Sequence, residues 1–483
     1  MPFNSADLQI LLPQIILVTW ASALLLIVVF NREAAKGLIP LLSAIGLGIT
    51  GIFLVPQFRL EQAAFSGMYV ADGFSTFLSL LLVLGGLLTI AVSYGYLQRM
   101  NLMRGEFYAL MLFSISGMML MASAADLIVV FLALELLSIP LYVLAAFARP
   151  EPRSEEAGLK YFLLGAFASG FLLYGIALVY GATGATALTG IVSAVQMGID
   201  QPLYLVLGAG LILTGLGFKV AAVPFHMWTP DVYHGSPTPV TAFMALGAKA
   251  AGFAALLRIF IVAFPEVSGQ ITPVLLTVTI ATLLAGNLLA IAQNNVKRML
   301  AYSSISHAGF ILMAVVVYGN DAARFDVVAS ALFYLLAFAL ASFGSWAVVM
   351  VIEKREGRGL EFSDYAGLGG KQPSLAIAMT IFMLSFTGVP PTLGFAGKFF
   401  LFRAVLEGGY VGLAIIGVLA SLISAYYYLR LVVVMFMQEG EPEIHKDRWL
   451  NLTAGATALA TVLLFVFSEP LFGWASQALL KVF

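Results

Sequence analysis

Eight ionisable side chains lie inside long apolar stretches of the sequence, where charge is expensive. On insertion scales each costs about 2.5–3.5 kcal/mol at the centre of a bilayer, so such groups mark ion pairs or paths for protons and ions. Burial favours the neutral form of a lysine and a nearby carboxylate favours its charged form, so such a pair can hold and release a proton. The eight groups are Glu135, Lys160, Lys219, Lys249, Arg258, His307, Lys398 and Arg430. They predict proton transfer rather than binding of an organic substrate, because no aromatic cage or cluster of oriented polar groups accompanies them.

Glu135 is the only carboxylate near the middle of an apolar stretch. Pro140 follows it and cannot donate a hydrogen bond to the carbonyl of Leu136, which weakens the helix beside the carboxylate. One interpretation of Glu135 is a structural ion pair with a neighbouring helix. The alternative is that Glu135 pairs with a lysine in a proton or ion path, which is the more usual role of a lone carboxylate within a membrane.

Two lysines each lie close to helix-breaking residues. Lys219 precedes Pro224 by five positions, and Lys398 follows Pro390 and Pro391 within eight. Broken helices at membrane depth are tolerated where they line a cavity or are buried in protein. We therefore expect two interrupted helices, each with one functional lysine, although Lys219 could instead extend its ammonium to the interface.

The remaining buried groups divide into candidates for the relay and structural groups. Lys249 lies among small residues that permit close helix packing, and His307 has an ordinary pKa near neutrality. Both are candidates for proton transfer, with structural packing as the alternative. Lys160 lies near a span end and is expected at the interface, with an extension of the Glu135–Lys219 region as the alternative. Arg258 and Arg430 are expected to be structural, because arginine does not deprotonate in proteins.

The composition excludes whole classes of protein. The chain has 483 residues, 61% of them hydrophobic and 10% charged, with 24 Lys+Arg against 25 Asp+Glu. These values exclude a soluble enzyme, and the charge balance argues against binding of nucleic acid. The chain has no cysteine, and its four histidines lack metal-binding spacing. We expect no metal, nucleotide or other cofactor on this chain, so any redox chemistry belongs to partners.

Apolar runs of spanning length recur along the whole chain. A spanning helix needs about 20 such residues, and the sequence contains about fourteen runs, which predicts an all-α polytopic membrane protein with helices 7 and 12 broken. The expected spans are 8–30, 37–55, 73–97, 107–124, 127–148, 158–182, 202–224, 239–264, 271–292, 298–318, 327–352, 373–405, 409–437 and 450–468.

Basic residues concentrate on one side of these spans. Loops after odd-numbered spans contain fourteen lysines and arginines, whereas the other loops and the two tails contain about four. Basic residues favour the cytoplasmic side, so we expect both termini outside an energy-transducing membrane, such as a bacterial inner membrane. The fourteen are Arg32, Lys36, Arg99, Arg104, Arg149, Arg153, Lys297, Arg298, Lys354, Arg355, Arg358, Lys371, Lys446 and Arg448.

The two lysines beside breaks lie five spans apart, and an odd offset reverses direction across the membrane. This spacing is typical of an inverted repeat. We expect a three-helix segment over 1–105, one five-helix half over 106–265, an inverted half over 266–438 and a last helix within 439–483.

Four stretches resemble one known family. They are LELLSIPLYVL, GFKVAAVPFHMWTPDVYHGSPTPVTAFMA, NNVKRMLAYSSISHAGF and FTGVPPTLGFAGKFFLF, and they are similar to motifs of the antiporter-like subunits of respiratory complex I. That family is related to multisubunit sodium/proton antiporters. Three features are typical of one subunit type within this family: the chain length, an end about fifteen residues after the last span, and a lysine at position 398. Another subunit type carries glutamate at the position of this lysine.

The resemblance implies two half-channels joined by a central polar axis. Glu135 and Lys219 form the pair of the first half, Lys249 links toward the second, His307 lies on the axis and Lys398 ends the path. Other subunits are expected to carry NADH, FMN, iron–sulfur clusters and quinone, and the partners are other membrane subunits, further antiporter-like ones included. The alternatives are a subunit of a sodium/proton antiporter and a stand-alone solute carrier.

Overall fold

The computed structural model of the chain describes residues 5–31, 37–317, 324–478 and 480. In these ranges, thirteen helices are long and apolar enough to cross a membrane. They are α2 (Leu12–Phe30), α3 (Leu38–Leu54), α4 (Gly73–Arg99), α5 (Glu106–Ser123), α6 (Leu127–Ala145), α7 (Pro152–Thr183), α9 (Pro202–Val220), α11 (Thr238–Ala263), α12 (Ser268–Ile291), α13 (Val296–Val316), α14 (Arg324–Ile352), α18 (Val411–Met437) and α19 (Arg448–Val466).

Shorter elements connect and flank these helices. They are α1 (Ser5–Ile10), α8 (Leu188–Met197), α10 (Trp228–Gly235), α15 (Leu368–Lys371), α16 (Pro373–Thr387), α17 (Leu393–Glu407) and α20 (Ser468–Gln477), the 3-10 helices η2 (Val55–Arg59), η3 (Pro265–Val267), η5 (Arg355–Gly357) and η6 (Phe362–Tyr365), and the strands β1 (Gln62–Ala64) and β2 (Tyr69–Ala71). β1 pairs antiparallel with β2. The apolar runs did not predict this hairpin, nor the helices α1, α8, α10 and α20.

The all-α polytopic fold predicted by the sequence is confirmed, and each long helix corresponds to one expected span. The expected span 373–405 is divided between α16 and α17, which 388–392 separate. The expected span 202–224 ends as a helix at Val220, and irregular chain leads to α10. By contrast, α6 runs without interruption through Pro140.

Local sequence signals set several helix ends. The Asp72 side chain accepts a hydrogen bond from the Ser75 amide, and the Ser75 hydroxyl accepts one from Asp72 N, which forms a capping box for α4. Asn295 caps α13 in the same position, and Asp447 caps α19. Proline occupies the first turn of α7, α9, α11 and α16, where its missing N–H costs nothing.

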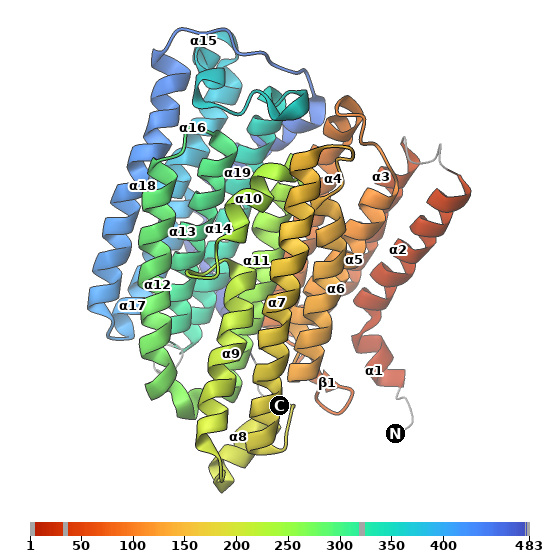
Figure 1. Ribbon diagram of the computed structural model, residues 1–483, viewed down its shortest axis with the longest axis vertical. Coiled ribbons are helices and arrows are strands. Elements are labelled where there is room, and N and C mark those ends of the chain that lie inside the picture. Colours follow the sequence, from red (N-terminus) through yellow and green to blue (C-terminus); the bar gives the residue numbers. More distant parts are fainter. Residues whose placement is uncertain (1–4, 32–36, 318–323, 479, 481–483) are drawn as a thin grey trace.

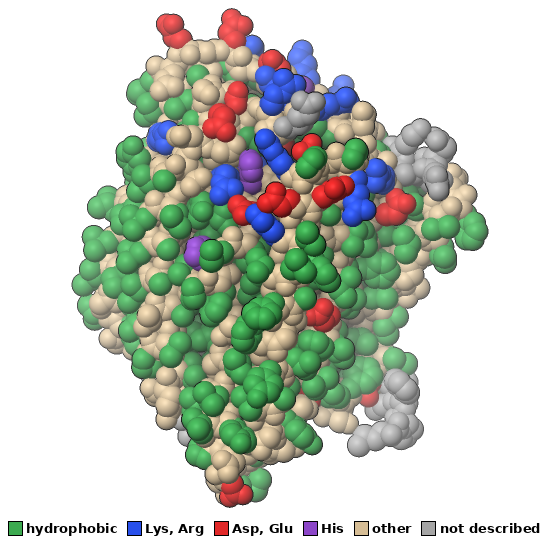
Figure 2. Space-filling view, in the orientation of Figure 1, with side chains coloured by type: hydrophobic (Ala, Val, Ile, Leu, Met, Phe, Trp, Pro, Cys, Tyr) green, Lys and Arg blue, Asp and Glu red, His purple; other side chains and the backbone are tan. Residues whose placement is uncertain are grey.

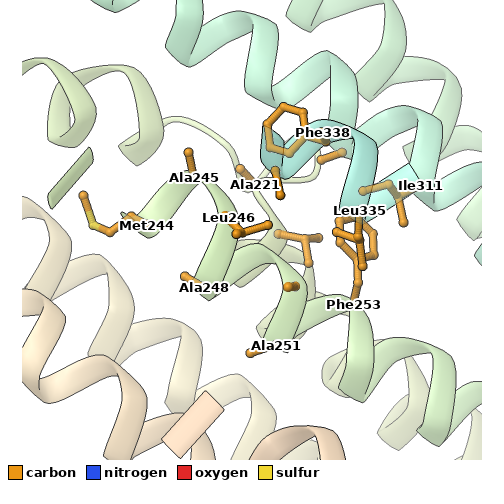
Figure 3. Close-up of a cluster of buried hydrophobic side chains, with 14 of the residues drawn as sticks. Ala221, Met244, Ala245, Leu246, Ala248, Ala251, Phe253, Ile311, Leu335 and Phe338 are labelled. Carbon is orange, nitrogen blue, oxygen red and sulfur yellow. The ribbon is translucent and has the colours of Figure 1, made fainter. Parts of the chain in front are cut away.

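Helix α11 lies at the centre of the bundle, and protein surrounds its apolar window on all sides. Figure 1 shows α2 and α3 at one flank and α17 and α18 at the other, with α11 between them. Small residues such as Ala245, Ala248 and Ala251 let neighbouring helices approach α11 (Figure 3). Phe253 of α11 lies beside Leu335 of α14 in the same view. Helix α11 thus contacts helices that precede it in the chain, such as α5 and α9, and helices that follow it, such as α13 and α14.

Charged side chains gather at one end of the molecule. Figure 2 shows lysine, arginine, aspartate and glutamate mainly over the end that carries α15, while hydrophobic side chains dominate the flank below. This distribution suits a protein that spans a bilayer and meets water at its ends. Three residues used for the expected orientation, Arg32, Lys36 and Lys481, lie outside the described residues.

Candidate functional site

Four of the five expected relay residues have almost fully buried side chains. Lys219, Lys249, His307 and Lys398 are each at most 4% exposed. Each forms hydrogen bonds with groups from other elements, and those contacts define the site. Glu135, the fifth, is partly buried on α6.

Lys219 lies in the last turn of α9, where the helix ends inside the bundle. Its Nζ donates to Ser138 Oγ of α6 at 2.7 Å and to Tyr161 OH of α7 at 3.2 Å. The Tyr161 ring stacks on Trp228 of α10 at 4.6 Å, which fixes the phenol beside the ammonium. Ala221, the residue that ends α9, adopts a left-handed conformation with φ of 62°, unusual for a residue with a Cβ. The packing thus holds Lys219 at the point where its helix stops.

Glu135 forms no direct ion pair with Lys219 in the described structure, although the resemblance implied this pair. The acceptors of Lys219 are the two hydroxyl groups, and Glu135 Oε1 is buried without a hydrogen-bond partner. Ser138 follows Glu135 by three positions on α6, and residues three apart share a helix face. The Ser138 hydroxyl accepts from Lys219 Nζ and donates to the carbonyl of Leu134 on its own helix.

Helix α11 brings Lys249 to the second half of the molecule. Lys249 Nζ donates to the carbonyl oxygen of Ser304 at 2.5 Å and to its hydroxyl at 2.9 Å. Gly252, three positions after Lys249, faces α9: a Cβ there would lie 3.5 Å from the Lys219 Cβ and 2.8 Å from a Val220 methyl. One face of α11 therefore contacts the stem of Lys219 and carries Lys249.

A single face of α13 connects the surroundings of Lys249 with those of Lys398. Ser304, His307 and Phe310 follow one another at intervals of three, a rise of about 4.5 Å per step. Ser304 accepts from Lys249, and the ring of Phe310 lies 4.3 Å from the Nζ of Lys398. The two lysines therefore contact the same helix about two turns apart.

His307 lies between these lysines with both ring nitrogens engaged. Nδ1 lies 2.6 Å from Tyr334 OH of α14, and Nε2 lies 3.1 Å from Tyr428 OH of α18. The Tyr428 hydroxyl also bonds Ser303. Hydroxyl groups donate and accept, so this cluster can reverse its hydrogen bonds as the imidazole gains or loses a proton.

Lys398 reaches the open end of the interrupted helix α16. Its Nζ donates to the carbonyl oxygens of Phe386 at 2.9 Å and Thr387 at 3.0 Å, and to Ser421 Oγ of α18 at 2.9 Å. The last carbonyls of a helix lack backbone donors and carry partial negative charge, so they stabilise a cation. The break in the helix thus creates the binding position of the ammonium.

The other three ionisable residues in the apolar stretches have structural partners. Arg258 forms two hydrogen bonds of 3.0 Å with Asp72, and both side chains are at most 1% exposed. Lys160 pairs with Glu156 and Asp231 and remains 40% exposed. Arg430 donates to the loop 293–294 after α12.

The prediction that Lys297 lies in a loop is wrong. It belongs to the first turn of α13 and is 2% exposed. Its Nζ donates to the Ser236 carbonyl at 2.7 Å and lies 3.8 Å from Glu353, which accepts a hydrogen bond from Thr238. The counter-charge comes from the residue after α14, far away in the sequence, so a count of local charges could not reveal the pair.

This pair lines a cavity of about 230 Å³ at the charge-rich end of the molecule. Arg153, His234 and Arg355 also line it. Burial, together with the nearby cations Lys297, Arg298 and Arg153, lowers the pKa of His234 to about 4. The imidazole is therefore neutral at neutral pH.

The lowered pKa of His234 predicts an acid-sensitive contribution to stability. Between pH 6.5 and about 4 the unfolded chain binds a proton at this residue and the folded chain does not, so the free energy of unfolding falls as the pH falls through this range. Replacement His234→Gln should remove this part of the pH dependence. The thermal midpoint of the intact assembly, measured from pH 7 to 4.5, checks it; identical pH profiles of both proteins contradict it.

The hydroxyl groups around the lysines were missed by the sequence analysis. Ser138 and Ser304 could have been found, because each lies three positions from a singled-out residue on the same helix. Tyr161 follows Lys160, which attracted attention for its charge instead. Tyr334 and Tyr428 carry no local signal, because their partner His307 is distant in the sequence.

The described residues contain no group of three or more His, Asp or Glu that could hold a metal ion. Comparisons with known proteins identify the family of the chain. Residues 124–424, which contain all five relay candidates, match the family model described as NADH:quinone oxidoreductase/Mrp antiporter, TM.

Curated relatives match almost the whole chain. "NADH-quinone oxidoreductase subunit N" of Trichlorobacter lovleyi is 46% identical over 95% of this chain and 93% of its own, and that of Chloroflexus aggregans is 44% identical over 98% and 97%. A chain of respiratory complex I from Thermus thermophilus is 37% identical, with a TM-score of 0.81 over 95% of this chain and 98% of that one. A chain of the Mrp complex from Dietzia has a TM-score of 0.85 over 98% and 97% but 21% identity, which shows a common fold. The chain therefore belongs to the family of NADH-quinone oxidoreductase subunit N.

Proposed function

We propose that the chain conducts protons across the membrane as part of NADH:quinone oxidoreductase, through Glu135, Lys219, Lys249, His307 and Lys398. The observation that carries this proposal is the row of contacts on α13, where Ser304, His307 and Phe310 lie between the ammonium groups of Lys249 and Lys398. Lysines removed from water in this way are poor structural elements and good proton carriers.

The first half operates around Lys219. The unpartnered oxygen of Glu135 is a proton acceptor without a fixed donor, and Ser138, three positions later on α6, bonds Lys219 through its hydroxyl group. A proton on Glu135 removes its negative charge, which lowers the affinity of Lys219 for its own proton. Lys219 then releases its proton toward Lys249, past the contact of Gly252 with the Lys219 stem.

In the second half, the proton passes from Lys249 through the hydroxyl groups around His307 toward Lys398. Phe310, Phe338 and Phe386 surround the imidazole, and no hydrogen-bond donor among the described residues joins His307 directly to Lys398. Water entering this apolar segment completes the path. We propose that the entry and exit of water here control proton transfer between His307 and Lys398, since hydrophobic constrictions control conduction by dewetting.

The cavity beside Lys297 and Glu353 supplies access from the charge-rich end, which the sequence predicts to be cytoplasmic. The chain contributes no redox centre of its own in this proposal. Partner subunits hold NADH, FMN, iron–sulfur clusters and quinone and carry out electron transfer, in a membrane expected to be a bacterial inner membrane. The sodium/proton antiporter alternative has weaker support, because the family model covers both kinds of protein and the solved Mrp chain is only 21% identical, whereas the curated relatives named as subunit N are 44–46% identical.

Replacement Gly388→Ala tests the role of Lys398 without removing the lysine. Gly388 ends α16 with φ of 88°, and a Cβ there would lie 2.9 Å from Lys398 Cδ. The ammonium should lose its carbonyl partners, and we expect the rates of proton pumping and of the coupled NADH oxidation to fall by about tenfold, the effect of about 1.4 kcal/mol on a rate. The measurement uses the complete complex in proteoliposomes.

Gly409→Ala is the matched control. Gly409 has φ of 85°, so alanine suffers the same backbone strain, but no atom lies within 4 Å of the added Cβ. Equal pumping rates in the two variants, with both complexes assembled, would remove Lys398 from the path. Substitution of potassium for sodium in the same assay should change nothing; a requirement for sodium supports the antiporter alternative.

A further inference from the structure

Two adjoining cavities lie on the side of the molecule formed by α3, α4 and α19, away from the proposed relay. The first, of about 400 Å³, is mainly apolar and is lined by Pro40, Leu41, Leu87, Ile90 and others. The second, of about 550 Å³, is lined by polar and apolar groups in similar measure and includes charged side chains. Tyr94 and Trp449 line both, so the two form one continuous groove.

The second cavity is basic. Arg99, Lys446 and Arg448 line it against a single carboxylate, Asp447. That carboxylate is already used, because it caps α19 by accepting from the amides of Trp449 and Leu450. The cavity therefore presents excess positive charge to any occupant.

Two nitrogens of the lining also have unused hydrogen-bonding capacity. Arg99 donates through its terminal nitrogen to the carbonyls of Met350 and Glu353, but its Nε has no partner. His445 Nε2 is likewise buried without one, and burial together with Arg99 lowers the pKa of this imidazole. An occupant that brings oxygen acceptors would satisfy the Nε–H of Arg99, and the Nε2 of His445 in the tautomer that carries the proton on this nitrogen.

The dimensions of the groove match one leaflet of a bilayer. On α4, the lining extends from Leu87 to Arg99, a rise of about 18 Å, of which the apolar part from Leu87 to Tyr94 accounts for about 10 Å. Half of a bilayer hydrocarbon core is about 15 Å thick. Trp449 is 51% exposed at the junction of the cavities, where amphipathic aromatic rings mark the boundary between acyl chains and headgroups.

We propose that this groove binds one anionic phospholipid, with an acyl chain along α4 and the phosphate group between Arg99, Lys446 and Arg448. Basic pockets beside membrane helices favour anionic headgroups. The basic end lies on the side predicted to be cytoplasmic, where such lipids attract juxtamembrane cations. The site is independent of the relay and holds whether or not the relay is correct.

The test uses the complete complex in nanodiscs that contain phosphatidylglycerol with a photoreactive diazirine in its acyl chain. After illumination, peptide mapping should place the label on α3 or α4 beside Leu41, Leu87 or Ile90. The same diazirine on phosphatidylcholine should label this segment about tenfold less, because its headgroup carries no net charge.

Two variants probe the two parts of the groove. The double replacement Lys446→Gln and Arg448→Gln should lower the phosphatidylglycerol label about tenfold, whereas Lys371→Gln, on an exposed cation outside both cavities, should not. Ala91→Phe fills the apolar cavity and should abolish the label, whereas Ala166→Phe, at an exposed position of α7, should leave it.

Each other pattern overturns the proposal. If phosphatidylglycerol and phosphatidylcholine label the segment equally, the groove does not select an anionic lipid. If phosphatidylglycerol labels all four variants to the same extent, the groove does not bind the lipid. If inorganic phosphate abolishes the labelling and Ala91→Phe leaves it intact, the groove is a site for soluble anions. Absence of label in the unmodified complex means that a partner subunit covers the groove.

Discussion

Replacement Lys219→Ala should abolish most proton pumping by the assembled complex, with a loss of about 10²-fold or more in the rate of the step, as for other removed acid–base groups. Electron transfer should slow with it, because the two are coupled. The physical reason is the position of the ammonium, which bonds Ser138 and Tyr161 at the end of α9. NADH oxidation and proton uptake by proteoliposomes measure both effects.

Two further variants separate proton transfer from charge and packing. Lys219→Arg keeps a cation at the end of α9 but cannot release its proton, so pumping should remain low. Lys160→Ala removes a lysine that is 40% exposed and paired at the surface, and should pump normally. An assembled Lys219→Ala complex that pumps at the normal rate and ratio would show that the relay assignment is wrong.

Replacement Arg258→Leu should prevent stable assembly. Asp72 would then remain buried without its cation, and removal of one partner from a buried ion pair costs about 3–5 kcal/mol. The carbonyl of Ala122 would also lose two donors. The amount of assembled complex in membranes, and its thermal midpoint after purification, measure the effect.

The double variant Arg258→Leu with Asp72→Leu is the control for this pair. It leaves no uncompensated charge, and apolar replacement of a buried pair is often neutral. Because Asp72 also caps α4, some loss should persist, of about 1 kcal/mol. If the double variant is as unstable as Arg258→Leu alone, the ion pair is not the cause.

Much of the fold was accessible from the sequence, because each long helix is a single apolar run. The elements that were missed, such as α8, α10 and the hairpin β1–β2, are short, and their apolar residues number too few to stand out. The interrupted regions beside Lys219 and Lys398 had a signal of their own, since Pro224, Pro390 and Pro391 cannot continue a helix. The inverted repeat and the domain boundaries stay predictions.

The candidate site was predictable for those residues whose burial in an apolar span has a large cost in free energy. The cost of charge in an apolar span selected Lys219, Lys249 and Lys398, and all three are buried. The cost of charge could not identify the hydrogen-bond partners of these lysines. A buried hydroxyl group costs less free energy than a buried charge, so serine and tyrosine do not stand out in an apolar span. The cost of charge also misplaced Lys297, whose burial depends on Glu353 from a distant element. Contacts between distant segments follow from packing, which a single sequence does not display.

The enclosure of α11 restricts how this molecule can switch. A helix in contact with protein on every side has no free volume to move into, and a displacement toward one half would require both halves to repack. Lys249 is therefore attached to a fixed frame. In the proposed path, the changes that open and close it are then expected from side-chain rotation, from water and from the ends of α9 and α16, where the chain leaves the helix.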